Sequence, residues 1–125
     1  QDVDLAADNP ILDQHNLLYA LHFYAASHKN ELREKAEYAI SKGLPLIISE
    51  WGTVSSDGDG FMDEESTLEW IRFIRKNNLT HLNWAVSDKN EAASILTKGA
   101  NSSGPWRPQD LTSSGKFVQK IIREW

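Results

Sequence analysis

Apolar residues follow two patterns along the chain, short continuous runs and helical stripes, and the two patterns alternate. The runs are rich in apolar and aromatic residues and have strand length; they cover residues 17–24, 45–50 and 80–86. The stripes repeat apolar residues every three to four positions; they cover residues 28–41, 62–77 and 113–124. The first run, LLYALHFY, predicts a strand that is buried on both faces, and PLIISE predicts a second buried strand.

The predicted order is strand, helix, strand, helix, strand, loop and helix, which indicates a parallel sheet with right-handed crossovers. Two architectures fit: a small doubly wound α/β domain, or consecutive units of a (β/α)8 barrel, which normally needs about 250 residues. The chain has 125 residues. No glycine-rich phosphate loop follows any predicted strand, which weakens a nucleotide-binding interpretation. Without a linker or low-complexity tract, residues 1–125 are predicted to form a single structural unit.

Functional groups of parallel α/β proteins gather where the strands end, at their carboxyl edge. The three predicted strands end at equivalent positions with polar and aromatic side chains, which are His22, Tyr24, Glu50, Trp84, Lys89 and Glu91. The loop that follows, residues 87–112, is longer than a simple connection requires and is predicted to be a binding element. Taken one at a time, His22 and Tyr24 can equally be core residues, and Lys89 with Glu91 can be a solvated charge pair.

Glu50 is the strongest candidate for chemistry, because it follows an apolar strand and is expected to be only partly solvated. A carboxylate fixed on a strand suits a glycosyl nucleophile, and retaining hydrolysis pairs it with a second carboxyl group as acid/base. A phenol beside it, such as Tyr24, could orient it through a hydrogen bond. The alternative is a glutamate that ends a strand and faces water.

Composition excludes several classes of function. The chain has no Cys and a net charge of −5 without a basic run, so disulfides, thiol chemistry, nucleic acid and anionic membranes are not expected. The four His are not closely paired, which argues against a structural zinc site. Five Trp are many for this length, and they can be core residues or flat surfaces that stack on sugar rings. Residues 57–60 do not match a calcium loop and predict a flexible turn.

Four segments together resemble the bacterial endoglucanases of glycoside hydrolase family 5. The segments are QDVDLAADNP (1–10), YALHFYA (19–25), LPLIISEWG (44–52) and NWAVSDKNE (83–91). The resemblance implies that the three strands are the sixth, seventh and eighth of a (β/α)8 TIM barrel, so that the chain is the C-terminal part of that barrel. It also implies a secreted, retaining endo-β-1,4-glucanase that acts on cellulose-type glucans and needs no metal or organic cofactor.

The resemblance assigns roles to individual residues. It implies that Glu50 is the catalytic nucleophile and that His22 and Tyr24 line the cleavage point. It further implies that Trp84 is the aromatic platform under the sugar next to the scissile bond, and that Lys89 and Glu91 bind hydroxyls one ring further out. Trp51, which follows the nucleophile, is expected to pack in the core.

The family's acid/base, a glutamate that follows an asparagine at the end of strand four, has no counterpart in this sequence. We therefore expect the isolated chain to be inactive unless the N-terminal half of the barrel completes it. An isolated three-stranded sheet would expose two edges and an apolar face, which predicts association with that half or with a second copy. The alternatives are a glucan-binding fragment with Trp106 added to its rim, a self-associating half-barrel without activity, and an unrelated α/β domain.

Overall fold

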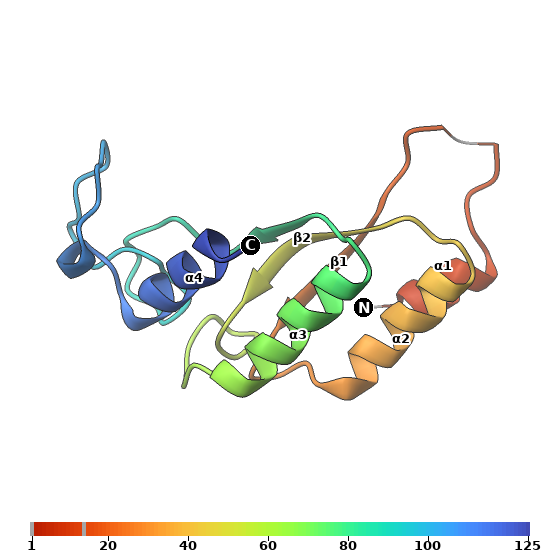
Figure 1. Cartoon of the computed structure of the whole chain (residues 1–125), viewed down its shortest axis with the longest axis horizontal. Helices are drawn as coiled ribbons and strands as arrows, with labels where there is room; N and C mark the ends of the chain where they lie inside the picture. The colour runs from red at the N-terminus through yellow and green to blue at the C-terminus, as the bar shows by residue number, and fades with distance from the viewer. Residues whose placement is uncertain (1, 14) are drawn as a thin grey trace.

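Three parallel strands form one sheet in the order β1-β2-β3 in the computed structural model, which describes residues 2–13 and 15–125 (Figure 1). The strands are β1 (Tyr19–Tyr24), β2 (Leu46–Gly52) and β3 (His81–Asn83). Helix α2 (Asn30–Ser41) connects the first two strands and α3 (Glu64–Lys76) connects the next two, while α4 (Ser113–Arg123) ends the chain. The predicted alternation of strands and helices is thus confirmed. Gln1 and Gln14 of the predicted unit lie outside the described residues.

Two short elements were not predicted. Helix α1 (Val3–Asp8) packs against α2, where its Asp4 lies 3.4 Å from Lys35 Nζ, and a 3-10 turn, η1 (Pro108–Asp110), precedes α4 (Figure 1). With six residues, α1 is too short to show an apolar stripe, and no side chain caps its first turn. Its existence depends on the contact with α2, which sequence periodicity does not report.

The prediction that β1 is buried on both faces is wrong. Leu21 and Phe23 are fully buried, whereas Ala20 and His22, which alternate with them, are exposed. The reason is that α2, α3 and α4 contribute their apolar residues to one core on a single side of the sheet. Strand β3 is also shorter than the predicted 80–86 and keeps Leu82 52% exposed, so the opposite face of the sheet stays open.

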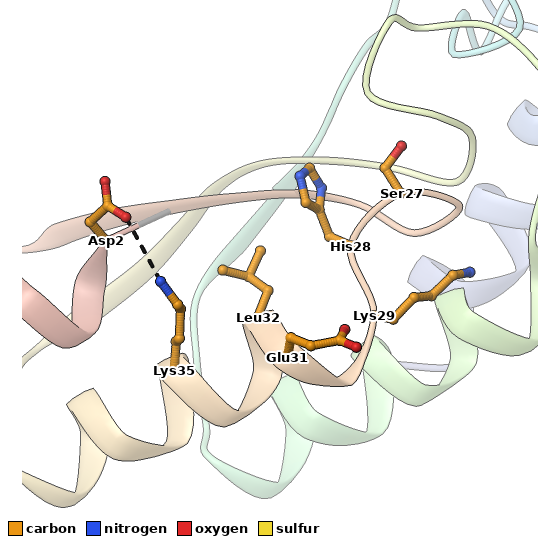
Figure 2. A pocket seen from close by; sticks show the side chains of 7 residues that line it. All are labelled: Asp2, Ser27, His28, Lys29, Glu31, Leu32 and Lys35. Carbon is orange, nitrogen blue, oxygen red and sulfur yellow. Dashed lines mark ion pairs between the residues drawn. The ribbon is translucent and has the colours of Figure 1, made fainter.

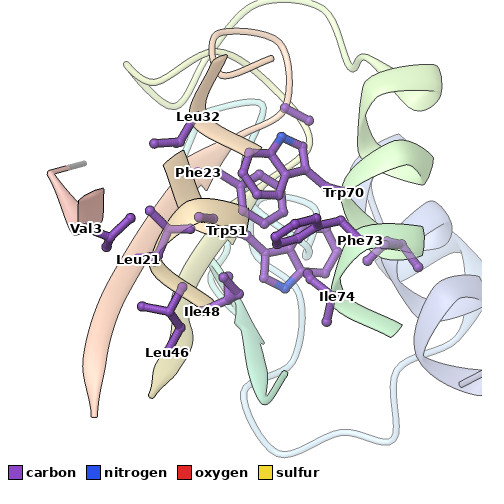
Figure 3. Close-up of a cluster of buried hydrophobic side chains, with 14 of the residues drawn as sticks. Val3, Leu21, Phe23, Leu32, Leu46, Ile48, Trp51, Trp70, Phe73 and Ile74 are labelled. Carbon is purple, nitrogen blue, oxygen red and sulfur yellow. The ribbon is translucent and has the colours of Figure 1, made fainter. Parts of the chain in front are cut away.

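A stack of three aromatic rings forms the centre of the core (Figure 3). Phe23 of β1 lies between Trp70 of α3, with ring centroids 4.1 Å apart, and Trp51 of β2, at 5.8 Å. Both buried indoles have a polar partner: Trp70 Nε1 donates to His28 O at 2.8 Å, and Trp51 Nε1 donates to His81 Nδ1 at 3.0 Å. The stack therefore joins two strands to a helix without leaving an indole N–H unsatisfied.

Side-chain caps set where two of the helices begin. Asp63 accepts a hydrogen bond from Ser66 N at 2.9 Å, and Thr112 Oγ1 accepts one from Gly115 N at the same distance. Asp63 also pairs with Lys29. The Lys29 ammonium and the Ser66 N–H hold the pKa of Asp63 below its usual range. Because Asp63 is the cap, α3 begins at Glu64, two residues after the predicted start.

The strand β2 contains one residue more than its neighbours over the same length. Ala20 pairs with Ile47 and His22 with Glu50, so two steps along β1 match three along β2. The same shift appears against β3, where Ile48 pairs with His81 and Trp51 with Asn83. This is a β-bulge at residues 48–50.

None of the helices in the described part of the chain has the length and apolar character needed to cross a bilayer.

Replacing Trp70 by Ala is expected to lower the free energy of unfolding by about 3–5 kcal/mol, because it removes the outer ring of the aromatic stack. Leu68→Ala, on the same helix but 39% exposed, is the matched control, with an expected loss of about 1 kcal/mol or less. Urea unfolding followed by tryptophan fluorescence measures both. Equal losses in the two variants would contradict the central position of the stack.

Candidate active site

The bulge in β2 turns Glu50 away from the core. In a regular strand, Ile48 and Glu50 would point to one face and Ser49 and Trp51 to the other. Instead Ile48 and Trp51 are both fully buried although they are three residues apart, and Ser49 and Glu50 both lie on the open face. Bulges beside active sites commonly redirect a side chain in this way.

Two side chains of β1 lie at the carboxylate of Glu50, which belongs to β2. Tyr24 OH donates a hydrogen bond to Glu50 Oε1 at 2.7 Å, and His22 Nδ1 lies 3.7 Å from Oε2. The Glu50 side chain is 22% exposed, in agreement with the expected partial solvation, and the His22 side chain is 51% exposed. The structure thus brings together the three residues predicted for catalysis; their roles stay predictions.

Tyr24 is held in its protonated form. Burial, followed by the hydrogen bond to Glu50 and the negative charges of Glu50 and Glu91, raises the pKa of Tyr24 far above its ordinary value. The phenol therefore stays protonated over the pH range in which proteins usually work. Tyr24 OH can donate its hydrogen bond to Glu50 Oε1 throughout that range.

A hollow of about 430 Å³ opens beside Tyr24. Its walls come from β1, from the loop after β2 and from the loop after β3, and they are formed by Tyr24, Ser56, Asp57, Gly58, Trp84, Ala85, Ser87, Lys89 and Glu91. Trp84 is 48% exposed, so part of its indole face is available to a ligand. The three residues predicted for sugar binding therefore share one hollow, and Tyr24 connects that hollow to Glu50.

The loops after β2 and β3 are tied together, which the sequence did not indicate. Ala92 N donates to Asp59 Oδ1 and Ala93 N donates to Gly58 O, both at 2.9 Å. The same region holds Glu91, whose side chain is 11% exposed and pairs with the 72% exposed Lys89. The turn at 57–60 thus supports the wall of the hollow. The partners are far apart in sequence, and no local pattern links them.

A family model described as cellulase (glycosyl hydrolase family 5) matches residues 1–90 of the chain. The chain belongs to glycoside hydrolase family 5. An endoglucanase from Clostridium saccharobutylicum is 45% identical over 122 residues, which are 98% of this chain and 27% of the relative. The chain thus spans about a quarter of the length of the curated relatives it matches.

Solved structures agree with the family 5 assignment. A structure from Cytophaga hutchinsonii is 40% identical, has a TM-score of 0.95, and is matched over 99% of this chain and 40% of its own length. An endoglucanase Cel5A variant from Thermobifida fusca, solved in complex with cellotetraose, is 28% identical with a TM-score of 0.86, over 98% of this chain and 40% of its own. The three strands and their helices are therefore part of a (β/α)8 barrel, and the predicted fold class is confirmed.

Two further tryptophans of the family 5 chain lie away from the hollow. Trp51 is fully buried, as expected for the residue after Glu50. Trp106 donates from Nε1 to Asn101 O at 2.6 Å within the long loop after β3, and the hollow is lined without it. Among the described residues, no group of three His, Asp or Glu side chains is placed to hold a metal ion.

A second hollow, of about 220 Å³, lies beside the start of α2 (Figure 2), and Glu50 is not among the residues that line it. Both of its lysines have partners: Lys35 pairs with Asp2 at 3.8 Å, and Lys29 pairs with Asp63. The His28 ring accepts a hydrogen bond from Tyr24 N at 2.9 Å. The two lysines and His28 are therefore engaged in structural contacts, and the candidate chemistry of the family 5 chain lies at Glu50.

Replacing Glu50 by Gln is expected to lower the pKa of Tyr24 toward its ordinary value of about 10, because the negative charge beside the phenol is removed. Ultraviolet titration of tyrosinate, with Tyr24→Phe to identify the signal, measures the change. The exposed Glu65→Gln serves as control. Because the pKa of Tyr24 is higher in the folded than in the unfolded chain, the protonated phenol contributes to the free energy of unfolding. This contribution is complete below pH about 10 and is lost as the pH rises through the folded-state pKa. An unchanged Tyr24 signal in Glu50→Gln would contradict the coupling.

Proposed function

We propose that the chain supplies the nucleophile and one side of the glucan cleft of a retaining endo-β-1,4-glucanase. The observation that carries the proposal is the Glu50 carboxylate at a strand end, fixed by Tyr24 at 2.7 Å beside a hollow with an exposed indole. Membership of family 5 and the endoglucanase names of the relatives support this substrate class.

In the proposed reaction, Glu50 attacks the anomeric carbon and forms a glycosyl-enzyme while the bond to the leaving oxygen breaks. The leaving oxygen takes its proton from an acid/base carboxyl group, which then deprotonates the water that hydrolyses the intermediate. Tyr24 occupies Oε1 of the nucleophile, so Oε2, which faces His22, is the oxygen free to attack.

Trp84, Lys89 and Glu91 are proposed to bind the glucan. The exposed face of Trp84 suits stacking on a pyranose ring, because sugar C–H groups pack well against an indole. Lys89 and Glu91 present donors and acceptors to hydroxyl groups along the same hollow. The cellotetraose bound to the Thermobifida fusca relative supports a cello-oligosaccharide as ligand.

The acid/base residue is proposed to come from the N-terminal half of the barrel. Residues 1–125 are proposed to form a single structural unit that packs against that half. The open face of the sheet supports this, because Leu82 is 52% and Trp84 48% exposed there. A second copy of the chain is the other candidate for covering this face. Secretion stays a prediction, in keeping with a polymeric substrate.

A second proposal is a glucan-binding or self-associating fragment without catalysis. The specific observation in its favour is that the Trp84 hollow is formed within this chain, whereas a second carboxyl group at the leaving oxygen is not assigned. Glucan binding without release of product would favour this second proposal.

The chain is expected to release reducing sugar from a soluble cellulose derivative only after addition of the part of the Cytophaga hutchinsonii protein that it does not cover. Acid–base assistance typically contributes 10²- to 10⁴-fold, so the chain alone should stay near background. In the completed barrel, Glu50→Gln should reduce the rate by several orders of magnitude, and the exposed Glu65→Gln should leave it unchanged. Full activity of completed Glu50→Gln would refute the nucleophile assignment.

Trp84→Ala is expected to weaken binding of a cello-oligosaccharide to the chain by about tenfold or more, because the stacking surface is lost. Isothermal calorimetry measures the affinity. Trp125→Ala is the matched control: Trp125 is 53% exposed, and its ring contacts the His81 ring in a tilted arrangement at the opposite end of β3. Equal loss of affinity in both variants would show that Trp84 is not the platform.

A further inference from the structure

Ser49, the residue before Glu50, contacts the same imidazole as Glu50 from its other side. Ser49 Oγ lies 2.9 Å from His22 Nε2, while His22 Nδ1 lies 3.7 Å from Glu50 Oε2. Consecutive residues of β2 thus face the two ring nitrogens of one histidine. In a regular strand these residues would point to opposite faces, so the arrangement depends on the bulge at residues 48–50.

The Glu50 carboxylate on one side and the Ser49 hydroxyl on the other together determine which nitrogen of His22 carries the proton. In a neutral imidazole, one ring nitrogen donates and the other accepts. A lone pair on Nδ1 would face the carboxylate with two acceptors opposed, whereas an Nδ1–H points a positive dipole at Oε2. Nε2 is then the acceptor, and the Ser49 hydroxyl is the donor that satisfies it.

We propose that Ser49 is a positioning residue that fixes His22 in its Nδ1–H form, with this N–H directed at Glu50 Oε2. The inference rests on the proposed role of Glu50 as nucleophile. Ser49 acts through the histidine: it sets the tautomer and the ring orientation, and the ring gives the attacking oxygen a fixed electrostatic partner.

Two other histidines of the chain provide an internal reference for the opposite tautomer. His28 Nδ1 accepts from Tyr24 N at 2.9 Å, and His81 Nδ1 accepts from Trp51 Nε1 at 3.0 Å. Both neutral rings therefore carry their proton on Nε2. We expect His22 to carry its proton on Nδ1 instead, so that one spectrum of the same sample shows both tautomers.

The test is a long-range ¹H–¹⁵N correlation spectrum of the labelled chain at about pH 8, above the ordinary His pKa of about 6.5. His22→Gln identifies the His22 signals by their disappearance. The Nδ1–H pattern of His22 is expected in the unaltered chain and in Ser49→Thr, which keeps the hydroxyl, and is expected to be lost in Ser49→Ala. Ser41→Ala, an exposed serine on α2, is the control substitution, and unchanged His28 and His81 signals report an intact fold.

An Nε2–H pattern for His22 in the unaltered chain, or an unchanged Nδ1–H pattern in Ser49→Ala, would overturn the inference. In the completed barrel, Ser49→Ala should lower kcat by about 10- to 100-fold with little change in KM, and Ser49→Thr should restore it. Full kcat in Ser49→Ala despite a changed tautomer would overturn the positioning role. Activity that survives Glu50→Gln would instead refute the proposed function, and the spectrum would still decide the tautomer.

Discussion

The extra residue in β2 links the core of this chain to its candidate chemistry. Ile48 and Trp51 are both fully buried although they are three residues apart, because Ile48 belongs to the core and Trp51 to the aromatic stack with Phe23 and Trp70. The two residues between them, Ser49 and Glu50, consequently share the open face. The burial of Ile48 and Trp51 thus accounts for the direction of the Glu50 carboxylate.

The order of strands and helices could be predicted from the sequence because the two kinds of element have different apolar patterns. The strands are short continuous apolar runs, and the helices repeat apolar residues every three to four positions. The meeting of His22 and Tyr24 at Glu50 also followed, since residues two apart on a strand share a face and parallel strands end at one edge. The exposed face of β1 was missed because a continuous apolar run does not reveal that the helices of this chain cover only one side of the sheet.

Other features could not be predicted because they depend on contacts between distant segments. Strict alternation along PLIISE would place Ser49 and Glu50 on opposite faces, and only the pairing of β2 with both neighbours reveals the bulge. The hydrogen bond between Ala92 N and Asp59 joins residues 33 positions apart, so a turn that was predicted to be flexible supports the wall of the hollow beside Tyr24. Helix α1 is a similar case, because its residues are ordered by α2.

The single-sided core has a consequence for how such a barrel can change over time. The strands of this chain pack on one side against helices of the same chain, whereas His22, Leu82 and Trp84 on the open face stay about half exposed. Recombination that joins this unit to a different set of preceding strands would alter the far wall of the cleft and leave the scaffold of Glu50 unchanged. In such a recombinant, the residues around Glu50 would be retained, and the residues on the opposite side of the barrel interior would be new.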